Sequence, residues 1–483
     1  MKAIKYLLMS ALLMGVSTAA MAQDGTKADV EAVKSLIKSK PADLDKQLKD
    51  FYKKNKKNAE NLVAFGRAFF EAKDTANAAV YARYALAATK NSCAPAYVLL
   101  GDIAAYGDDG GAAALNYEQA IYADPKNPEA YYKYATVYRK IDAEGAVAKL
   151  EELRQQRPDY PVDALIGHLN YLSMRYGPAI QAFGRVPLAD LQRRDYVEYA
   201  FSGYLAKQYT KAIEICEAGL KKEPVNATLN RLAMFCNTET KNYDAALRYA
   251  DVLFNKVDKD SVNISEMDHL YFAKALIGAE RIDDAIAELQ KGLKIETEEA
   301  SAHAELYNTL SDAYKAKKEY TSAIDNYRKY LETAKEADAT EWAGLGMLYM
   351  QYARNVENEV ERADIYKLAD KAFAELIEKF PEAEEYGLQQ RGYANANADP
   401  KMTEGLAKPH FERLIELIQA HEEKTAVDNN RLLDCYRYLM SYYYQQKDNE
   451  KALEYAQKQL ELKPDDADLL KVVESLTKSI NRK

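Results

Sequence analysis

The chain has 483 residues, of which 48% are hydrophobic and 29% charged, and its formal net charge is −9 at pH 7. Such a chain can bury a core and stay soluble. Its acidity argues against a broad nucleic-acid surface, because that binding depends on neutralising phosphates. With only 20 Gly and 13 Pro, the composition favours long helices over a sheet-rich fold with many tight turns.

The N-terminus has the pattern of a secretory signal peptide. Lys2 and Lys5 form a basic region, residues 6–16 form an apolar run too short for a bilayer span, and Ala20-Met21-Ala22 supplies a small-residue cleavage site. We expect cleavage after Ala22 and export, most simply to the periplasm. No Cys follows the small residues, so a lipid anchor is not supported. No later stretch approaches the ~18 apolar residues of a membrane span, so no transmembrane segment is expected in the mature chain.

Residues 23–58 predict a helical pair that caps the next part of the chain. Two apolar stripes with spacings of three and four residues, one on each side of Pro41, indicate the two helices. The pair lacks the small residues of the later units, as expected of an atypical end.

Between residues 59 and 466 a helix–turn–helix unit recurs with a period of roughly 34 residues, in about eleven copies. The stretch from Ala94 to Pro125 is its clearest copy. The first helix has a slot for Gly or Ala, filled by Gly66, Gly101, Ala135, Gly167, Ala200, Ala233, Ala273 and Gly346. The second helix has a slot for Ala, filled by Ala78, Ala113, Ala146, Ala179, Ala212, Ala245, Ala285, Ala323, Ala369, Ala407 and Ala452. Because small residues let two helices pack closely, we expect the two slots to face each other. Proline ends the second helix at Pro125, Pro158, Pro224, Pro381 and Pro464.

Some units depart from this pattern. The unit that starts at Pro128 is one residue short, which we assign to its turn. About eleven extra residues near 355–365 are expected to lengthen both helices of their unit and the turn between them. The unit near Ala383 places Gln390 in the small slot and predicts a loop at residues 394–400. Residues 467–483 predict a capping helix with one polar face.

Together these slots resemble the tetratricopeptide repeat (TPR): Leu100-Gly101, Ala113, Tyr117, Ala120 and Pro125 stand at matching places, and the same phase is kept across the array. The resemblance implies an all-α fold, an α-solenoid wound as a right-handed superhelix, that acts through its concave side. A TPR subclass clamps a partner's C-terminal carboxylate with Lys and Asn. Here Val63, Val98, Tyr132 and Val197 fill the slot of the first Lys, so that clamp is not supported.

The sequence offers no catalytic set, cofactor motif or metal motif, so we expect no enzyme activity, no cofactor and no bound metal. The stretch from Gly107 to Gly111 is expected to be a turn. The four cysteines of the mature chain are expected to be buried; a Cys216–Cys236 bridge remains open, since export would permit it.

The exposed slots of the first helices are therefore the candidate binding surface. They predict Arg67 and Asp102 early in the array and Asn230, Met234 and Asn237 later. The candidate site residues are Tyr132, Arg139, His168, Tyr171, Phe201, Tyr204 and Lys274. Packing between units is one interpretation of these apolar side chains; the other is a groove for an apolar helix or an extended peptide.

The function that this sequence favours is a non-enzymatic scaffold in the cell envelope that binds a protein or peptide partner. The alternative is a surface or periplasmic protein that captures a glycan or peptide ligand. The sequence leaves the oligomeric state open.

Overall fold

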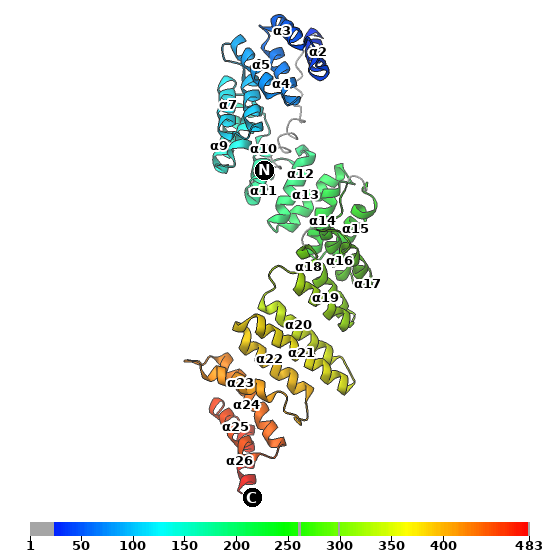
Figure 1. Ribbon diagram of the computed structural model, residues 1–483, viewed down its shortest axis with the longest axis vertical. Coiled ribbons are helices and arrows are strands. Elements are labelled where there is room, and N and C mark those ends of the chain that lie inside the picture. Colours follow the sequence, from blue (N-terminus) through cyan, green and yellow to red (C-terminus); the bar gives the residue numbers. More distant parts are fainter. Residues whose placement is uncertain (1–23, 259–261, 298–299, 482–483) are drawn as a thin grey trace. The chain divides into compact units, whose positions relative to one another are not determined.

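The computed structural model describes residues 24–258, 262–297 and 300–481 (Figure 1). These residues form 25 α-helices, three short 3-10 helices and no β-strand, which confirms the all-α prediction. No described helix combines the length and apolar character of a membrane span. The predicted signal peptide, residues 1–22, lies outside the described residues.

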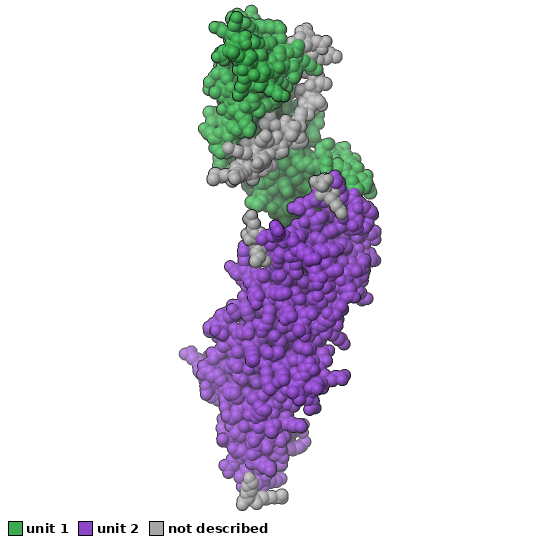
Figure 2. Space-filling model, turned by 45° about the vertical axis from the view of Figure 1, so that its right-hand side comes forward, with its two compact units in different colours: residues 1–240 green, residues 241–483 purple. Residues whose placement is uncertain are grey.

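The chain divides into two compact units, Met1–Thr240 and Lys241–Lys483, shown in different colours in Figure 2. Unit 1 contains α2 (Asp24–Ser39), α3 (Leu44–Asn55), α4 (Ala59–Glu71), α5 (Thr75–Ala88), α6 (Ala94–Tyr106), α7 (Gly110–Ala123), α8 (Pro128–Tyr138), α9 (Ala143–Gln156), α10 (Val162–Leu172), α11 (Tyr176–Phe183), α12 (Arg193–Leu205), α13 (Tyr209–Lys222) and α14 (Ala227–Glu239).

Unit 2 contains α15 (Tyr243–Asn255), α16 (Glu266–Gly278), α17 (Ile282–Gly292), α18 (Ala304–Ala316), α19 (Tyr320–Thr333), α20 (Ala339–Arg354), α21 (Glu359–Lys379), α22 (Glu384–Ala398), α23 (Lys408–Gln419), α24 (Ala426–Gln445), α25 (Asn449–Leu462) and α26 (Ala467–Ile480). Within each unit, consecutive helices pack as antiparallel hairpins, and each hairpin packs on the next. Each unit is therefore a solenoid segment, in which a helix pair buries its apolar side against its neighbours.

The small slots make the predicted contact in one pair and a different contact in others. A Cβ placed on Gly101 would lie 2.4 Å from the ring of Tyr117, and one placed on Gly167 would lie 2.7 Å from the ring of Phe183, so these slots make room for the bulky ring of the second helix. A Cβ placed on Gly66 would lie 3.1 Å from the Ala78 carbonyl oxygen, so in that pair the two small slots do face each other. The Ala slots of the second helices are buried as expected.

The unit near Ala383 keeps this contact through another residue. A Cβ on Gly392 would lie 2.4 Å from the ring of Phe411, so Gly392, and not Gln390, fills the small slot. The prediction failed because α22 continues to Ala398, which removes the predicted loop at 394–398 and shifts the register by two residues.

Three-residue turns join the first helix to the second in eight pairs, and the middle residue of each has a left-handed backbone, with φ between 57° and 65°. In unit 1 the next N–H then bonds back to a carbonyl five residues earlier, as from Asp74 to Phe69 at 2.9 Å and from Gln208 to Gly203 at 2.8 Å. These bonds satisfy carbonyls at the end of the first helix. The stretch from Gly107 to Gly111 belongs to one of these turns and the start of α7, as predicted.

The other irregular units are also resolved. The helix α8 has 11 residues and its turn has four, so the shortening falls in the first helix and not in the turn. The extra residues of the unit at 339–381 do lengthen both helices, to 16 residues in α20 and 21 in α21. Each stop proline lies two residues after the last residue of its helix.

Candidate interaction surface

Six of the seven predicted site residues lie on α8, α10 and α12 of unit 1, or at the end of α8, and contacts between these helices link them. We call this surface the first-helix face; besides these six residues it includes Arg67, Asp102, Lys133, Arg194 and Glu198. The seventh residue, Lys274, lies on α16 of unit 2. Its amine lies 3.9 Å from Glu305 and 5.7 Å from the centre of the Tyr271 ring, so these contacts are local to that unit.

A buried chain of hydrogen bonds joins three consecutive first helices. Tyr132 Oη lies 2.9 Å from His168 Nε2, and His168 Nδ1 lies 2.7 Å from Glu198 Oε2. Only 5% of His168 and 6% of Glu198 is exposed. Burial raises the pKa of Tyr132, so its hydroxyl keeps its proton at neutral pH and can donate to His168. The arrangement thus ties α8, α10 and α12 together.

Two arginines stand beside this chain. Arg194 Nε lies 3.8 Å from Glu198 Oε1 and Arg194 Nη2 lies 3.3 Å from Asp195. Arg139, the residue after α8, donates from Nη1 to the Leu172 carbonyl at 3.3 Å. Burial lowers the pKa of Arg139, and among the described residues no carboxylate lies within 4.0 Å of its guanidinium. The Nε atoms of both arginines are buried without a hydrogen-bond partner.

Aromatic rings form a second feature of the first-helix face. Tyr171 meets Phe201 edge-on at 6.1 Å between ring centres, Phe201 lies 6.3 Å from Tyr204, and Tyr204 lies 5.8 Å from Phe235. Tyr171, Phe201 and Tyr204 are half-buried, so each keeps part of its ring accessible. Rings with one packed side and one open side suit an interface.

Nearer to the N-terminus the same face is charged. Lys133 pairs with Asp102 at 2.6 Å and with Glu129 at 3.1 Å, and Arg67 lies 3.5 Å from Glu129. Asp102 also accepts from the Tyr117 hydroxyl at 2.8 Å. These pairs occupy the charges of Arg67 and Asp102, so this part of the face is already saturated with internal partners.

The prediction for α14 was wrong. Asn230 and Asn237 are 1% exposed and Met234 is fully buried, so these residues do not line an open surface. The two Asn side chains donate to main-chain carbonyls, Asn230 to Asn226 and Asn237 to Ala233, which satisfies their amides inside the protein. The sequence showed the polarity of these residues but not that their own helix would satisfy it.

Sequence reasoning also missed contact partners of the predicted residues. Glu198, Arg194 and Lys133 make the contacts that fix His168 and Asp102, yet they are ordinary polar residues in the sequence. The available signal was their spacing: Glu198 stands four residues after Arg194, and Lys133 four after Glu129. Such pairs lie on one side of a helix.

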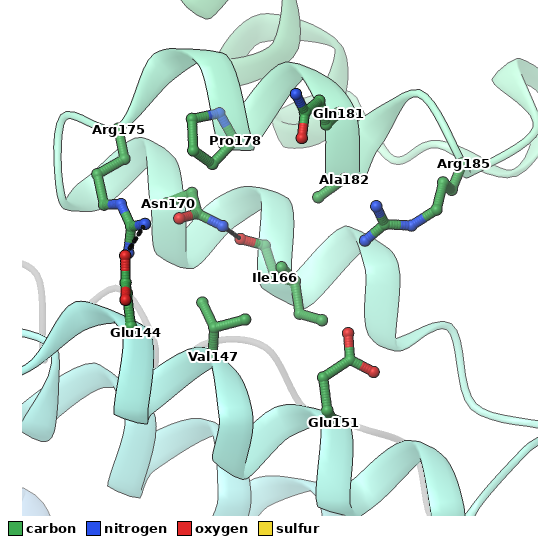
Figure 3. Close-up of a pocket in the computed structure, with 10 residues that line it drawn as sticks. All are labelled: Glu144, Val147, Glu151, Ile166, Asn170, Arg175, Pro178, Gln181, Ala182 and Arg185. Carbon is green, nitrogen blue, oxygen red and sulfur yellow. Dashed lines mark hydrogen bonds and ion pairs between the residues drawn. The ribbon is translucent and has the colours of Figure 1, made fainter.

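A pocket of about 210 Å³ lies between α9, α10 and α11 of unit 1 (Figure 3). Arg175 pairs with Glu144 at 2.9 Å at one end, and Arg185 and Glu151 stand at the other. Val147 and Ile166 line the space between. The charges of the lining residues balance, so the pocket has no strong preference for an ion.

The described residues contain no group of three or more potential ligands that could hold a metal. All four cysteines are buried and free, including Cys216 and Cys236, which the sequence left open to a bridge. Burial raises the pKa of Cys216 and Cys236, so both thiols stay protonated and unreactive.

Several helix pairs of both units repeat the same contact, with a small residue under a ring at Gly101, Gly167, Gly346 and Gly392, and a proline follows several of the second helices. The fold is a tetratricopeptide-repeat type array. No protein-family model matches the chain, and no curated protein matches it.

Several solved structures are similar to it. The C-terminal part of a TPR repeat-containing protein from Cytophaga hutchinsonii matches at 23% identity and a TM-score of 0.45, over 57% of this chain and 99% of that one. PilF of Pseudomonas aeruginosa matches at 17% identity and a TM-score of 0.33, over 41% and 89%. The human IFIT1 dimer with PPP-AAAA matches at 17% identity and a TM-score of 0.33, over 84% and 97%. Because these TM-scores are below 0.5, the likenesses carry no information on the ligand of this chain.

Proposed function

We propose that this protein is a non-enzymatic scaffold of the cell envelope, and that it binds an extended segment of a partner protein on the first-helix face of unit 1. The observation that carries the proposal is the run of half-buried rings Tyr171, Phe201 and Tyr204, which crosses from α10 to α12. An extended segment can place successive apolar side chains against successive rings.

The Tyr132–His168–Glu198 chain has the order of a nucleophile, a base and an orienting acid. Burial favours a structural role. His168 and Glu198 are 5% and 6% exposed, where α8, α10 and α12 are joined, so a substrate could not reach the imidazole without separating these helices. We therefore assign the chain to holding the face in shape, which supports a binding role over a catalytic one.

Site-specific photocrosslinking tests the binding proposal. A benzophenone amino acid in place of Tyr204 should crosslink a distinct protein in cells that make the chain, and mass spectrometry would identify it. The same substitution at exposed Lys221 on α13 is the control. Phe201→Ala should reduce the crosslink at residue 204. Equal crosslinking at residues 204 and 221, or none at either, would refute the proposal; crosslinking to glycan or lipid instead would support ligand capture.

The envelope location is proposed from the sequence alone and has its own test. Cleavage after Ala22 would leave Gln23 as the first residue. Intact-mass measurement of the protein recovered from the periplasmic fraction should give the chain from Gln23. Recovery only of the full-length chain from the cytoplasm would refute export.

A further inference from the structure

One turn position breaks the pattern of the array in two neighbouring helix pairs. In the eight three-residue turns the left-handed residue is charged seven times, at Lys73, Asp108, Lys207, Lys241, Glu280, Lys318 and Lys447. In the turn between α10 and α11 it is Met174, and 74% of Met174 is exposed. In the preceding pair, Ile141 stands at the corresponding place before the α9 cap and is 75% exposed. The other four-residue turn has Glu357 there.

Each of the two exceptional turns contacts a helix end of the other pair. Arg139 donates to the Leu172 carbonyl at 3.3 Å, and Arg175 pairs with Glu144 at 2.9 Å. The Arg139–Leu172 contact joins residues just before Ile141 and Met174, and the Glu144–Arg175 contact joins residues just after them. Because both contacts link the same two segments, Ile141 and Met174 lie on one edge of unit 1. The pocket of Figure 3 begins at the Arg175–Glu144 pair and therefore adjoins this edge.

A charge without a counterion lies close to both residues along the chain: Arg139 is two residues before Ile141, and its guanidinium bonds to the carbonyl of Leu172, two residues before Met174. Within the described part of the chain no carboxylate pairs with Arg139, and its Nε is buried without a partner. A charge that is taken out of water is stabilised by an acid partner. Arg139 therefore offers an unfilled place for a carboxylate, next to two exposed apolar groups.

We propose that the edge formed by Arg139, Ile141 and Met174 binds a partner-protein segment that presents a carboxylate beside apolar side chains. The carboxylate pairs with Arg139, and the apolar groups cover Ile141 and Met174. The inference rests on the proposed scaffold function and adds the chemistry of the bound segment. An anionic membrane surface would meet charges of both signs here, Lys140 and Asp142 in the turn and Glu144 at the start of α9, and it is the alternative that the vesicle experiment below tests.

The test selects peptides from a random displayed library on the full chain. Selected peptides should contain Asp, Glu or a free C-terminal carboxylate next to Leu, Ile, Phe or Met. The double variant Ile141→Lys/Met174→Lys introduces the residue that other turns carry, so the fold should be kept. It should weaken binding of the selected peptides by at least about tenfold, the equivalent of ~1.4 kcal/mol. Lys318→Met in unit 2 is the matched control and should change nothing.

Arg139→Gln tests the carboxylate. Replacing the acid of a selected peptide by its amide should cost the wild type about tenfold in affinity, and should cost Arg139→Gln less than about threefold. The inference is overturned if no acidic–apolar peptide is selected, if the double Lys variant binds as the wild type does, or if the acid-to-amide change costs both proteins equally.

Two further arms separate this inference from its alternatives. If Phe201→Ala weakens binding of the selected peptides and the double Lys variant does not, the first-helix face binds these peptides. The edge proposal then fails while the proposed scaffold function stands. Stronger binding of the wild type than of the neutral variant Ile141→Ser/Met174→Ser to vesicles of phosphatidylcholine with phosphatidylglycerol would assign the edge to a lipid surface and overturn the proposal.

Discussion

Replacing His168 by Leu tests whether the Tyr132–His168–Glu198 chain holds unit 1 together. The substitution removes the two contacts of 2.8 and 2.7 Å that Glu198 makes with the imidazole, and leaves Arg194 Nε at 3.8 Å as the nearest cation. Leaving the buried Glu198 carboxylate without this hydrogen-bond partner costs about 3 kcal/mol or more, because a charged group loses more than the ~1–3 kcal/mol of a neutral one. Arg194 remains and water can reach its side of the site, so we expect the lower end, about 3 kcal/mol.

The loss should be measured locally, because the stability of a repeat array is a sum over neighbouring pairs and a single midpoint does not describe it. Hydrogen exchange with mass spectrometry resolves peptides from α10 and α12. A loss of ~3 kcal/mol lowers their protection roughly a hundredfold. Peptides from α4 and α5 provide the internal reference.

The double variant His168→Leu/Glu198→Leu provides the control. It leaves no buried charge to compensate, so it should recover most of the loss and bring protection to within about 1 kcal/mol of the wild type. If His168→Leu exchanges like the wild type in α10 and α12, or if the double variant is no better than the single one, the chain is not a structural tie. The assignment of these residues to fold rather than to chemistry would then be refuted.

Three further predictions concern the array and are read by the same exchange measurement. Gly167→Ala should destabilise α10 and α11 by about 1–2 kcal/mol, because its Cβ would lie 2.7 Å from the buried Phe183 ring. Gly177→Ala in α11, where a Cβ would have nothing within 4 Å, should be neutral or stabilising. Equal effects of the two substitutions would contradict the packing argument. Lys207→Gly should stabilise its pair by ~0.5–1 kcal/mol, since φ is 57° there, and a loss of protection would contradict this. Burial raises the pKa of Asp399, but the hydrogen bonds that its carboxylate accepts from Thr403, Glu404 and Gly405 together lower that pKa below 3.8. The stability that this carboxylate adds is therefore present at neutral pH and lost as the pH falls below 3.8 through the depressed pKa. The variant Asp399→Ala should not show this acid-induced loss.

The sequence was sufficient for the all-α architecture because the same slots recur along the array. One unit is a weak match, but the repeated phase averages out local exceptions. Errors occur where a unit changes its helix length. The predicted loop after residue 394 is a continuation of α22 to Ala398, which moves the small slot away from Gln390, and the shortening of the unit at Pro128 falls in α8 rather than in its turn.

The candidate site was predictable only in part. Helical periodicity placed Tyr132, His168, Tyr171 and Phe201 on adjoining first helices, because equivalent positions of a repeat occupy equivalent places in the folded array. Their partners could not be predicted in the same way. His168 and Glu198 are 30 residues apart, and which polar residue of the next helix reaches the imidazole depends on how closely the pairs pack.

The repeats also supply an internal reference for separating fold from function. A departure from the repeat that keeps the packing contact needs only a structural explanation, as where Gly392 takes over the small slot beneath the Phe411 ring. Ile141 and Met174 are different, because they change an exposed turn position that packs against little and is otherwise charged. Exposing a large apolar side chain favours self-association and contributes nothing to the fold. Packing does not explain two such residues near an arginine without an acid, and the bound segment that we propose for the α8–α11 turns rests on this difference from the other turns.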